Sequence, residues 1–216
     1  MNWKYFIAFP FIDTRINFIS AVKKSGALLD IGSSDGQTLL HISEARPDLN
    51  LYATDIAGSP ENYPAAAIFF RADIVNDKLE LADETIDAVT CMHLVEHIPD
   101  MNNLFAECFR VLKAGGKIYI ETPHPKTLVL SIPIESQAGH FTYNFFDDLT
   151  HIQIMPVGKI AAIARQNGFD VDRVGTSRNL LFAFLYLFSF LFDDRKKMIT
   201  RVHFKGWSSY IVLKKN

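Results

Sequence analysis

Short apolar runs of strand length alternate with longer segments of mixed polarity along most of the chain. Runs that end at glycine or at polar residues predict seven strands, and the segments between them predict four helices. This alternation is typical of an α/β fold, in which right-handed crossovers join parallel strands. The predicted strands are 27–32, 50–55, 67–72, 86–92, 116–122, 169–175 and 207–213, and the predicted helices lie near 12–24, 36–45, 101–112 and 156–167.

The segment LLDIGSSDG (28–36) ends an apolar strand in an acidic residue and a glycine-rich turn. Gly32 and Gly36 let the backbone turn sharply and approach a ligand, because no Cβ is in the way. A strand, such a turn and a helix form the crevice in which α/β sheets bind nucleotides. The dinucleotide fingerprint G-x-G-x-x-G needs glycines where Ser34 and Gln37 stand, and no G-K-[ST] follows, so neither that motif nor a P-loop is present.

Two further acidic residues stand at the ends of the next predicted strands. Asp55 ends LYATDIA (51–57), and Asp73 follows the strand in IFFRADIV (68–75). The carboxylate of Asp55 could accept hydrogen bonds from both vicinal hydroxyls of a ribose. Asp87, which opens the fourth strand, is expected to order the local turn rather than touch a ligand.

The motif D-x-G-x-x-x-G (30–36), the two strand-end acids, LVEHIPD (94–100) and RVLKAGGK (110–117) together resemble the class I S-adenosylmethionine (SAM) methyltransferases over about 26–175. The segment DDLTHIQIMPVGKIAAIARQNGFDV (147–171) resembles the small-molecule and glycan type of that family. Ser34 departs from the glycine common in the motif, and Ala114 stands where proline is usual. The resemblance implies an α/β, Rossmann-like, seven-stranded and mostly parallel sheet, with helices on both faces and the last strand antiparallel. It also implies one domain over 1–216, with acceptor-side insertions at about 123–155 and 176–206, and SAM as cofactor.

The resemblance also assigns residues to parts of the donor. It implies a turn around the methionine end, a ribose contact, an adenine contact, and two histidines after the fourth strand that border or shape the donor site. These residues are Asp30, Gly32, Ser34 and Gly36 for the turn, Asp55 for the ribose, Asp73 and Ile74 for the adenine, and His93 and His97 after the strand; Ile56, next to Asp55, is also expected to contact the donor.

The insertion 123–155 follows the fifth strand and should therefore overhang the carboxyl edge of the sheet, where the methyl group is transferred. If the acceptor is a hydroxyl, a general base must remove its proton, and histidine has a well-matched pKa. His151 is the first candidate, oriented by Asp147 or Asp148; the alternative is that His151 only caps or packs under the following helix. The other candidates are His97, His124 and His140. Asp147, Asp148 and His151 also have a spacing compatible with a metal ion, but the pattern of metal-dependent O-methyltransferases is not seen, so no metal is expected.

The insertion 176–206 contains the thirteen-residue segment LLFAFLYLFSFLF (180–192), followed by DDRKK. A bilayer span needs about 20 residues, so this segment is too short to cross a membrane. It is expected to be a buried or homodimer-forming helix. The alternatives are peripheral contact with a membrane surface, with Arg195, Lys196 and Lys197 at anionic head groups, or a pocket for a lipid-linked acceptor.

Composition narrows the partners and the compartment. The chain has 216 residues and a net charge of −2, so nucleic acid is not an expected partner. Cys91 and Cys108 suggest neither a disulfide framework nor a metal site, which fits a reducing cytoplasm, and residues 1–20 do not make a convincing signal peptide. The expected location is the cytoplasm, either free or at a membrane surface.

The expected function is transfer of a methyl group from SAM to a small-molecule or glycan hydroxyl by in-line displacement, with polysaccharide biosynthesis as the setting. Two alternatives stay open at this point. One is C-methylation of a quinone-like or lipid-linked acceptor, and the other is a non-catalytic interaction module that keeps the fold.

Overall fold

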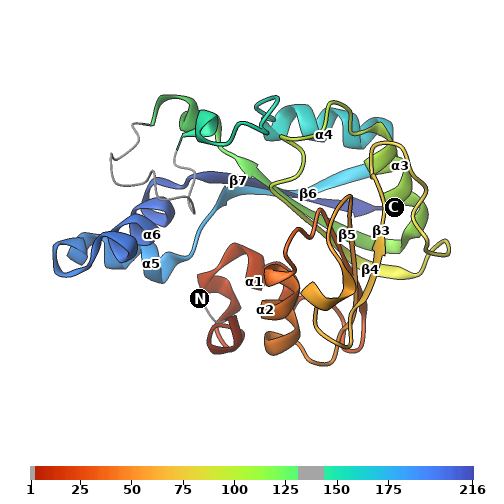
Figure 1. Cartoon of the computed structure of the whole chain (residues 1–216), viewed down its shortest axis with the longest axis horizontal. Coiled ribbons are helices and arrows are strands. Elements are labelled where there is room, and N and C mark those ends of the chain that lie inside the picture. Colours follow the sequence, from red (N-terminus) through yellow and green to blue (C-terminus); the bar gives the residue numbers. More distant parts are fainter. Residues whose placement is uncertain (1–2, 131–143) are drawn as a thin grey trace.

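The computed structural model describes residues 3–130 and 144–216, which are organised around one sheet of seven strands (Figure 1). The strand order is β3-β2-β1-β4-β5-β7-β6. The first five strands are parallel, and β7 runs antiparallel between β5 and β6. The expected Rossmann-like topology with an antiparallel last strand is therefore confirmed. The strands are β1 Ala27–Ile31, β2 Asn50–Asp55, β3 Ile68–Arg71, β4 Ile86–Met92, β5 Leu112–Pro123, β6 Phe169–Ser177 and β7 Ser208–Lys215.

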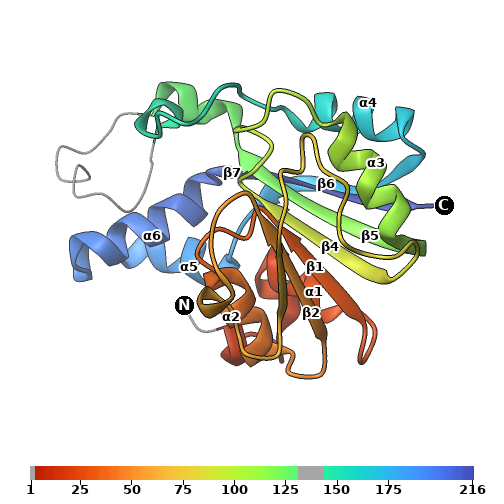
Figure 2. The same ribbon diagram turned by 45° about the vertical axis from the view of Figure 1, so that its right-hand side comes forward.

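Helices cover both faces of the sheet. Helices α1 (Thr14–Ser20) and α2 (Gln37–Ala45) pack on one face, and α3 (Asn102–Val111) and α4 (Val157–Gln166) pack on the other (Figures 1 and 2). Successive side chains of β1 enter opposite cores, Leu28 among the residues of α1 and α2 and Leu29 among those of α3 and α4.

The first helix is shorter than the predicted range 12–24. The Asp13 side chain accepts hydrogen bonds from the backbone N–H groups of Arg15 and Ile16, which fixes the helix start. At the other end, Ala21 N donates to Phe18 O (3.1 Å), a tighter turn that ends the regular helix. The predicted bounds were wrong because a cap and a closing turn, rather than apolar periodicity, decide both ends.

The register of the parallel strands brings the three strand-end acids to one edge of the sheet. Asp30 pairs with Ala53 of β2 and Thr90 of β4, and Asp55 pairs with Arg71 of β3. Asp73 follows β3 directly. The loops after β1, β2, β3 and β4 therefore converge, as ligand-binding loops do in open α/β sheets.

The insertion 176–206 forms two helices beyond the end of the sheet, α5 (Leu180–Leu185) and α6 (Asp194–Lys205), joined by a 3-10 segment, Tyr186–Leu191 (Figure 2). Neither α5 nor the 3-10 segment has a buried residue, and Phe190 and Leu191 are 75% and 69% exposed. The expectation of a buried helix is therefore wrong, because the segment packs beside α6 and projects away from the sheet. Among the described residues, no helix has both the length and the apolar character needed to cross a bilayer.

Candidate active site

The turn after β1 has a backbone that glycine suits. Gly32, Ser34 and Gly36 all have positive φ, at 72°, 49° and 76°. A Cβ on Gly36 would lie 2.3 Å from Asn62 O, so only glycine fits there. Gly32 N donates to Thr54 O (2.9 Å), which fastens the turn to β2.

A cavity of about 420 Å³ lies at this edge of the sheet, among the loops after the first four strands. That volume is within the range of small-molecule sites in proteins. The Ile56 side chain, 65% exposed, gives the cavity an open apolar surface. Six of the residues predicted to contact the donor line the cavity, namely Gly32, Asp55, Ile56, Asp73, Ile74 and His97.

The carboxylate of Asp55 is held at both oxygens. Its Oδ2 accepts a hydrogen bond from Ser34 N (2.8 Å), and its Oδ1 accepts one from Ala57 N (2.9 Å). Each oxygen has a second lone pair, so the fixed carboxylate can still accept two hydroxyls. In the same way, Asp73 accepts from Val75 N (2.9 Å) and Asn76 Nδ2 (2.8 Å) while it lines the cavity.

Asp30 lies beneath the glycine-rich turn and is only 2% exposed. Thr90 Oγ1 donates a hydrogen bond to its Oδ1 (2.6 Å). Burial raises the pKa of Asp30 to about 7, although the Thr90 bond opposes the rise. This carboxyl group therefore changes its charge near neutral pH.

A group of charges centred on the buried Glu121 connects α1 to the loop after β4. Glu121 of β5 is fully buried, and Arg15 donates to both of its oxygens, with Nε 2.8 Å from Oε2. Tyr119 and Ser177 also donate to Oε2, each at 2.8 Å. Burial alone would raise the pKa of Glu121, but the Arg15 guanidinium and His93 hold it well below its ordinary value.

His93 lies between two buried carboxylates. Its Nδ1 is 3.0 Å from Glu96 Oε1, and its Nε2 is 3.4 Å from Glu121 Oε1. Burial opposes protonation, but the two carboxylates raise the pKa of His93 to about 9. His93 is therefore an imidazolium at neutral pH, and its side chain joins the charge group rather than accepting a proton.

Two more histidines and Glu96 meet beside the donor cavity. The rings of His97 and His151 are 4.8 Å apart between centroids. His151 Nδ1 is 2.6 Å from Phe145 O, and His97 Nδ1 is 3.2 Å from Thr150 O. Glu96 is fully buried, and its Oε2 has no hydrogen-bond partner within the described part of the chain.

The acids predicted to orient His151 have separate local contacts. Asp147 Oδ2 accepts from Asn144 N (2.8 Å) in a capping box, so this carboxylate orders the turn before His151. Asp148 Oδ2 lies 3.9 Å from His151 Nε2, too far for a hydrogen bond. The role of His151 as a base stays a prediction.

The remaining histidine candidates are elsewhere. His124 Nδ1 accepts from Lys126 N (3.1 Å) and caps the 3-10 helix Pro125–Val129. Burial and the nearby Lys126 lower the pKa of His124, so it is neutral at pH 7. His140 lies outside the described residues.

Sequence reasoning missed Arg15, Glu96 and Glu121. Glu121 interrupts the apolar run KIYIETP, and a charge at a position predicted to be buried signals a partner. No comparable pattern pointed to Arg15 or Glu96 as members of the same group.

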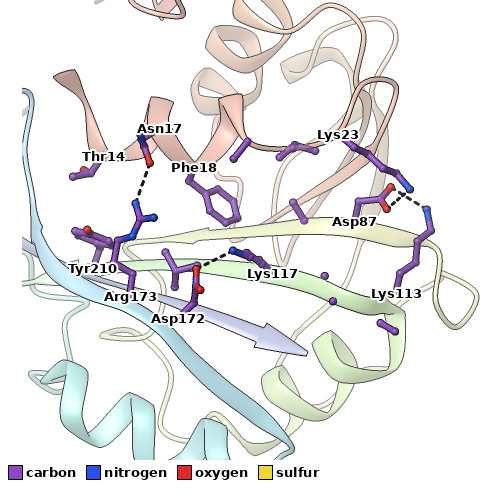
Figure 3. Close-up of a pocket in the computed structure, with 17 residues that line it drawn as sticks. Thr14, Asn17, Phe18, Lys23, Asp87, Lys113, Lys117, Asp172, Arg173 and Tyr210 are labelled. Carbon is purple, nitrogen blue, oxygen red and sulfur yellow. Dashed lines mark hydrogen bonds and ion pairs between the residues drawn. The ribbon is translucent and has the colours of Figure 1, made fainter. Parts of the chain in front are cut away.

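A second cavity, of about 370 Å³, lies between α1 and the amino ends of β4 and β5 (Figure 3). Its lysines are paired within the chain: Lys23 and Lys113 both bind Asp87, at 2.8 Å and 2.9 Å, and Lys117 binds Asp172 at 2.9 Å. Asp87 also accepts from Ala27 N (2.9 Å), which agrees with its expected local role. This cavity contains none of the predicted site residues.

Comparison with known proteins decides the family. The sequence model of a protein family described as a methyltransferase domain matches residues 6–174 of this chain. The chain belongs to the methyltransferase domain family. The ubiquinone biosynthesis O-methyltransferase of Xanthomonas oryzae is 34% identical over 119 residues, which cover 50% of this chain and 48% of that protein. The protein of the same name from Pseudomonas fluorescens is 28% identical over 182 residues, covering 79% of this chain and 74% of that protein. The chain thus matches about half the length of the first of these relatives.

Solved methyltransferases share the fold of this domain. A SAM-dependent methyltransferase from Mesorhizobium loti has a TM-score of 0.65 at 16% identity, covering 97% of this chain and 98% of its own. One from Archaeoglobus fulgidus has a TM-score of 0.63 at 21% identity, covering 92% and 90%. The expected family and fold are confirmed, and SAM is the cofactor that they imply.

Proposed function

We propose that the chain transfers a methyl group from SAM to an oxygen atom of a small-molecule acceptor. The observation that carries the proposal is the pair of anchored carboxylates in the cavity of a methyltransferase domain. Asp55 and Asp73 are each held by two hydrogen bonds and both line the cavity. Two preorganised acceptors at adjacent strand ends suit a ribose and an adenine.

In this proposal the donor lies along the loops after β1, β2 and β3. Asp30, Gly32, Ser34 and Gly36 surround the methionine end. Asp55 accepts the ribose hydroxyls, Ile56 packs on the base, and Asp73 with Ile74 meets the adenine edge. The sulfonium is a good leaving group, so the main task of the protein is to align the acceptor oxygen with the methyl carbon.

The acceptor we favour is a hydroxyl on an apolar, quinone-like ring. The relatives named ubiquinone biosynthesis O-methyltransferase support an O-methyl product. The exposed apolar residues of 180–192 support a lipid-linked acceptor, because they would hold the enzyme where such a molecule resides. A sugar hydroxyl is the second candidate, and C-methylation of the same ring is the third.

The same segment supports contact with an anionic membrane surface. The insertion 176–206 has six Lys or Arg residues against two Asp, in a chain with a net charge of −2. Exposed aromatic and aliphatic side chains next to basic residues suit an interfacial helix, with the cations at the head groups. If residues 180–192 instead form the interface of a homodimer, the proposed membrane contact is replaced by that dimer.

The test has two stages. Calorimetric titration with SAM and S-adenosylhomocysteine should give saturable binding of both, and Asp55→Ala should remove it. Transfer of labelled methyl is then measured to a prenylated catechol, a nucleotide sugar and a ring that lacks the hydroxyl. Label on the catechol oxygen supports the proposal. Label found only on the sugar, or only on a carbon atom of the ring, would overturn the proposed ring-hydroxyl acceptor. Binding of SAM without transfer to any acceptor would favour a non-catalytic interaction module.

A further inference from the structure

Glu96, His97 and His151 come together from two segments that are far apart in the sequence. One ligand atom of each lies within 4.8 Å of the other two. Glu96 and His97 follow β4, and His151 precedes α4. Ile152 N donates to Glu96 O (3.0 Å), so backbone hydrogen bonding fastens the two segments together.

Each imidazole has one nitrogen engaged with a backbone carbonyl. Because a carbonyl oxygen only accepts, Nδ1–H of His151 donates to Phe145 O. The Thr150 hydroxyl donates to Asp148 Oδ1 (2.6 Å), so Nδ1–H of His97 donates to Thr150, whose Oγ1 and O lie 3.0 Å and 3.2 Å away. The Nε2 lone pair of each ring then remains available. Metal-binding histidines are usually oriented in this way, with the second ring nitrogen donating to a carbonyl or a carboxylate.

The third group is the carboxylate of Glu96, whose side chain is fully buried. Its Oε1 is bound by His93 Nδ1 at 3.0 Å, while its Oε2 has no hydrogen-bond partner among the described residues. A buried carboxylate oxygen without a partner is costly. A cation at Oε2 would remove that cost.

We propose that Glu96, His97 and His151 bind one divalent transition-metal ion. Two imidazoles and one carboxylate are a ligand set suited to Zn²⁺, Mn²⁺ or Fe²⁺, and they leave further positions for water or substrate. Asp148 Oδ2, 3.9 Å from His151 Nε2, is an additional oxygen close to the cluster. This set differs from Asp147, Asp148 and His151, whose local spacing did not predict a metal site.

The position of the ion would suit the methyl transfer, and this step rests on the proposed function. His97 lines the donor cavity, so an ion bound to its ring would lie at the wall of that cavity. The acceptor hydroxyl binds the ion and loses its proton to solvent, because a bound cation lowers the pKa of an oxygen ligand. The oxygen then bonds to the methyl carbon, the C–S bond breaks, and its electron pair stays on sulfur in S-adenosylhomocysteine. In this scheme His151 is a ligand, not the general base.

The test uses the full chain after removal of metal with a chelator. Co²⁺ titration followed by visible absorption, and Zn²⁺ titration by calorimetry, should show one ion per chain. Glu96→Gln and His151→Gln should each weaken binding at least about tenfold. His41→Gln is the matched control, because His41 lies on α2 and stacks on Trp3, outside the cluster.

S-adenosylhomocysteine binding, measured on the same samples, shows that the variants are folded and that the donor site is intact. The metal site is overturned if the wild-type chain binds S-adenosylhomocysteine but neither Co²⁺ nor Zn²⁺. It is also overturned if His41→Gln weakens metal binding as much as Glu96→Gln and His151→Gln do. If the chain binds metal but not S-adenosylhomocysteine, the metal site stands and the proposed function fails. Full methyl transfer by metal-free protein overturns the catalytic role of the ion.

Discussion

Asp30 should couple donor binding to the release of a proton. The carboxyl group is buried beneath the turn proposed to hold the methionine end, and burial raises its pKa to about 7. The methionine end of a bound donor would bring its ammonium group close to Asp30, and this positive charge favours the ionised form of the Asp30 carboxyl group. Below pH 7 the free protein holds a proton on Asp30 that binding must displace, so affinity should rise with pH.

The magnitude follows from the shift. Raising the pKa of Asp30 from 3.8 to about 7 corresponds to about 4 kcal/mol against the ionised form in the free protein. If binding requires ionisation, the dissociation constant at pH 6 should be about tenfold larger than at pH 8, with little further change above pH 8. Binding should release about half a proton per ligand at pH 7 and nearly one at pH 6.

Calorimetry with S-adenosylhomocysteine, repeated in buffers with different ionisation enthalpies, measures the protons released. Asp30→Asn keeps the shape and the acceptor oxygen for Thr90 but cannot titrate, so its affinity should not follow this pH dependence. A wild-type protein that releases no proton between pH 6 and 7, or an Asp30→Asn variant that releases as many as the wild type, would refute the reasoning.

Three further predictions concern the ribose contact, the buried charges and the exposed segment. Asp55→Asn should weaken S-adenosylhomocysteine binding about 100-fold in calorimetry, because one anchored charged acceptor becomes a donor; a change below threefold contradicts the assignment. Glu121→Gln should lower the free energy of unfolding by about 3–5 kcal/mol in denaturant titration, since it leaves Arg15 and His93 facing a neutral amide; a loss under 1 kcal/mol speaks against the pairing. Phe190→Ser with Leu191→Ser should reduce sedimentation with phosphatidylglycerol vesicles and leave the melting temperature unchanged, whereas a shift from dimer to monomer without an effect on vesicle binding favours the dimer.

Much of the donor side could be predicted from the sequence because it is local. Each strand-end acid lies next to its own strand, and parallel pairing brings such ends to one edge without further information. Asp55, Asp73, Gly32 and Ile56 accordingly line one cavity. Asp30 differs, because its burial beneath the turn depends on packing that no spacing reveals.

The acceptor side could not be predicted in the same way, because its contacts are between distant segments. His97 and His151 each have a plausible local interpretation, and only the fold brings their rings within 4.8 Å. Spacing paired His151 with Asp147, whose carboxylate caps a turn. The prediction that segment 180–192 is buried was wrong for a related reason. Apolar composition indicates that a helix is favoured in contact with other apolar groups, but it does not show whether those groups belong to the same chain.

The buried charges also bear on the metal proposal. Glu121 is fully buried and Arg15 and His93 are partly buried, so their charges are costly to desolvate, and each is offset by an opposite charge in direct contact. One oxygen of Glu96 is bound to His93, and the other has no partner among residues 3–130 and 144–216. In the described part of the chain, the hydroxyls of Thr54 and Thr122 are also buried without partners, but a neutral hydroxyl costs far less than a carboxylate oxygen. The network pairs its other charges and leaves one carboxylate oxygen without a partner among the described residues, in a residue that clusters with two imidazoles, so a cation would complete it.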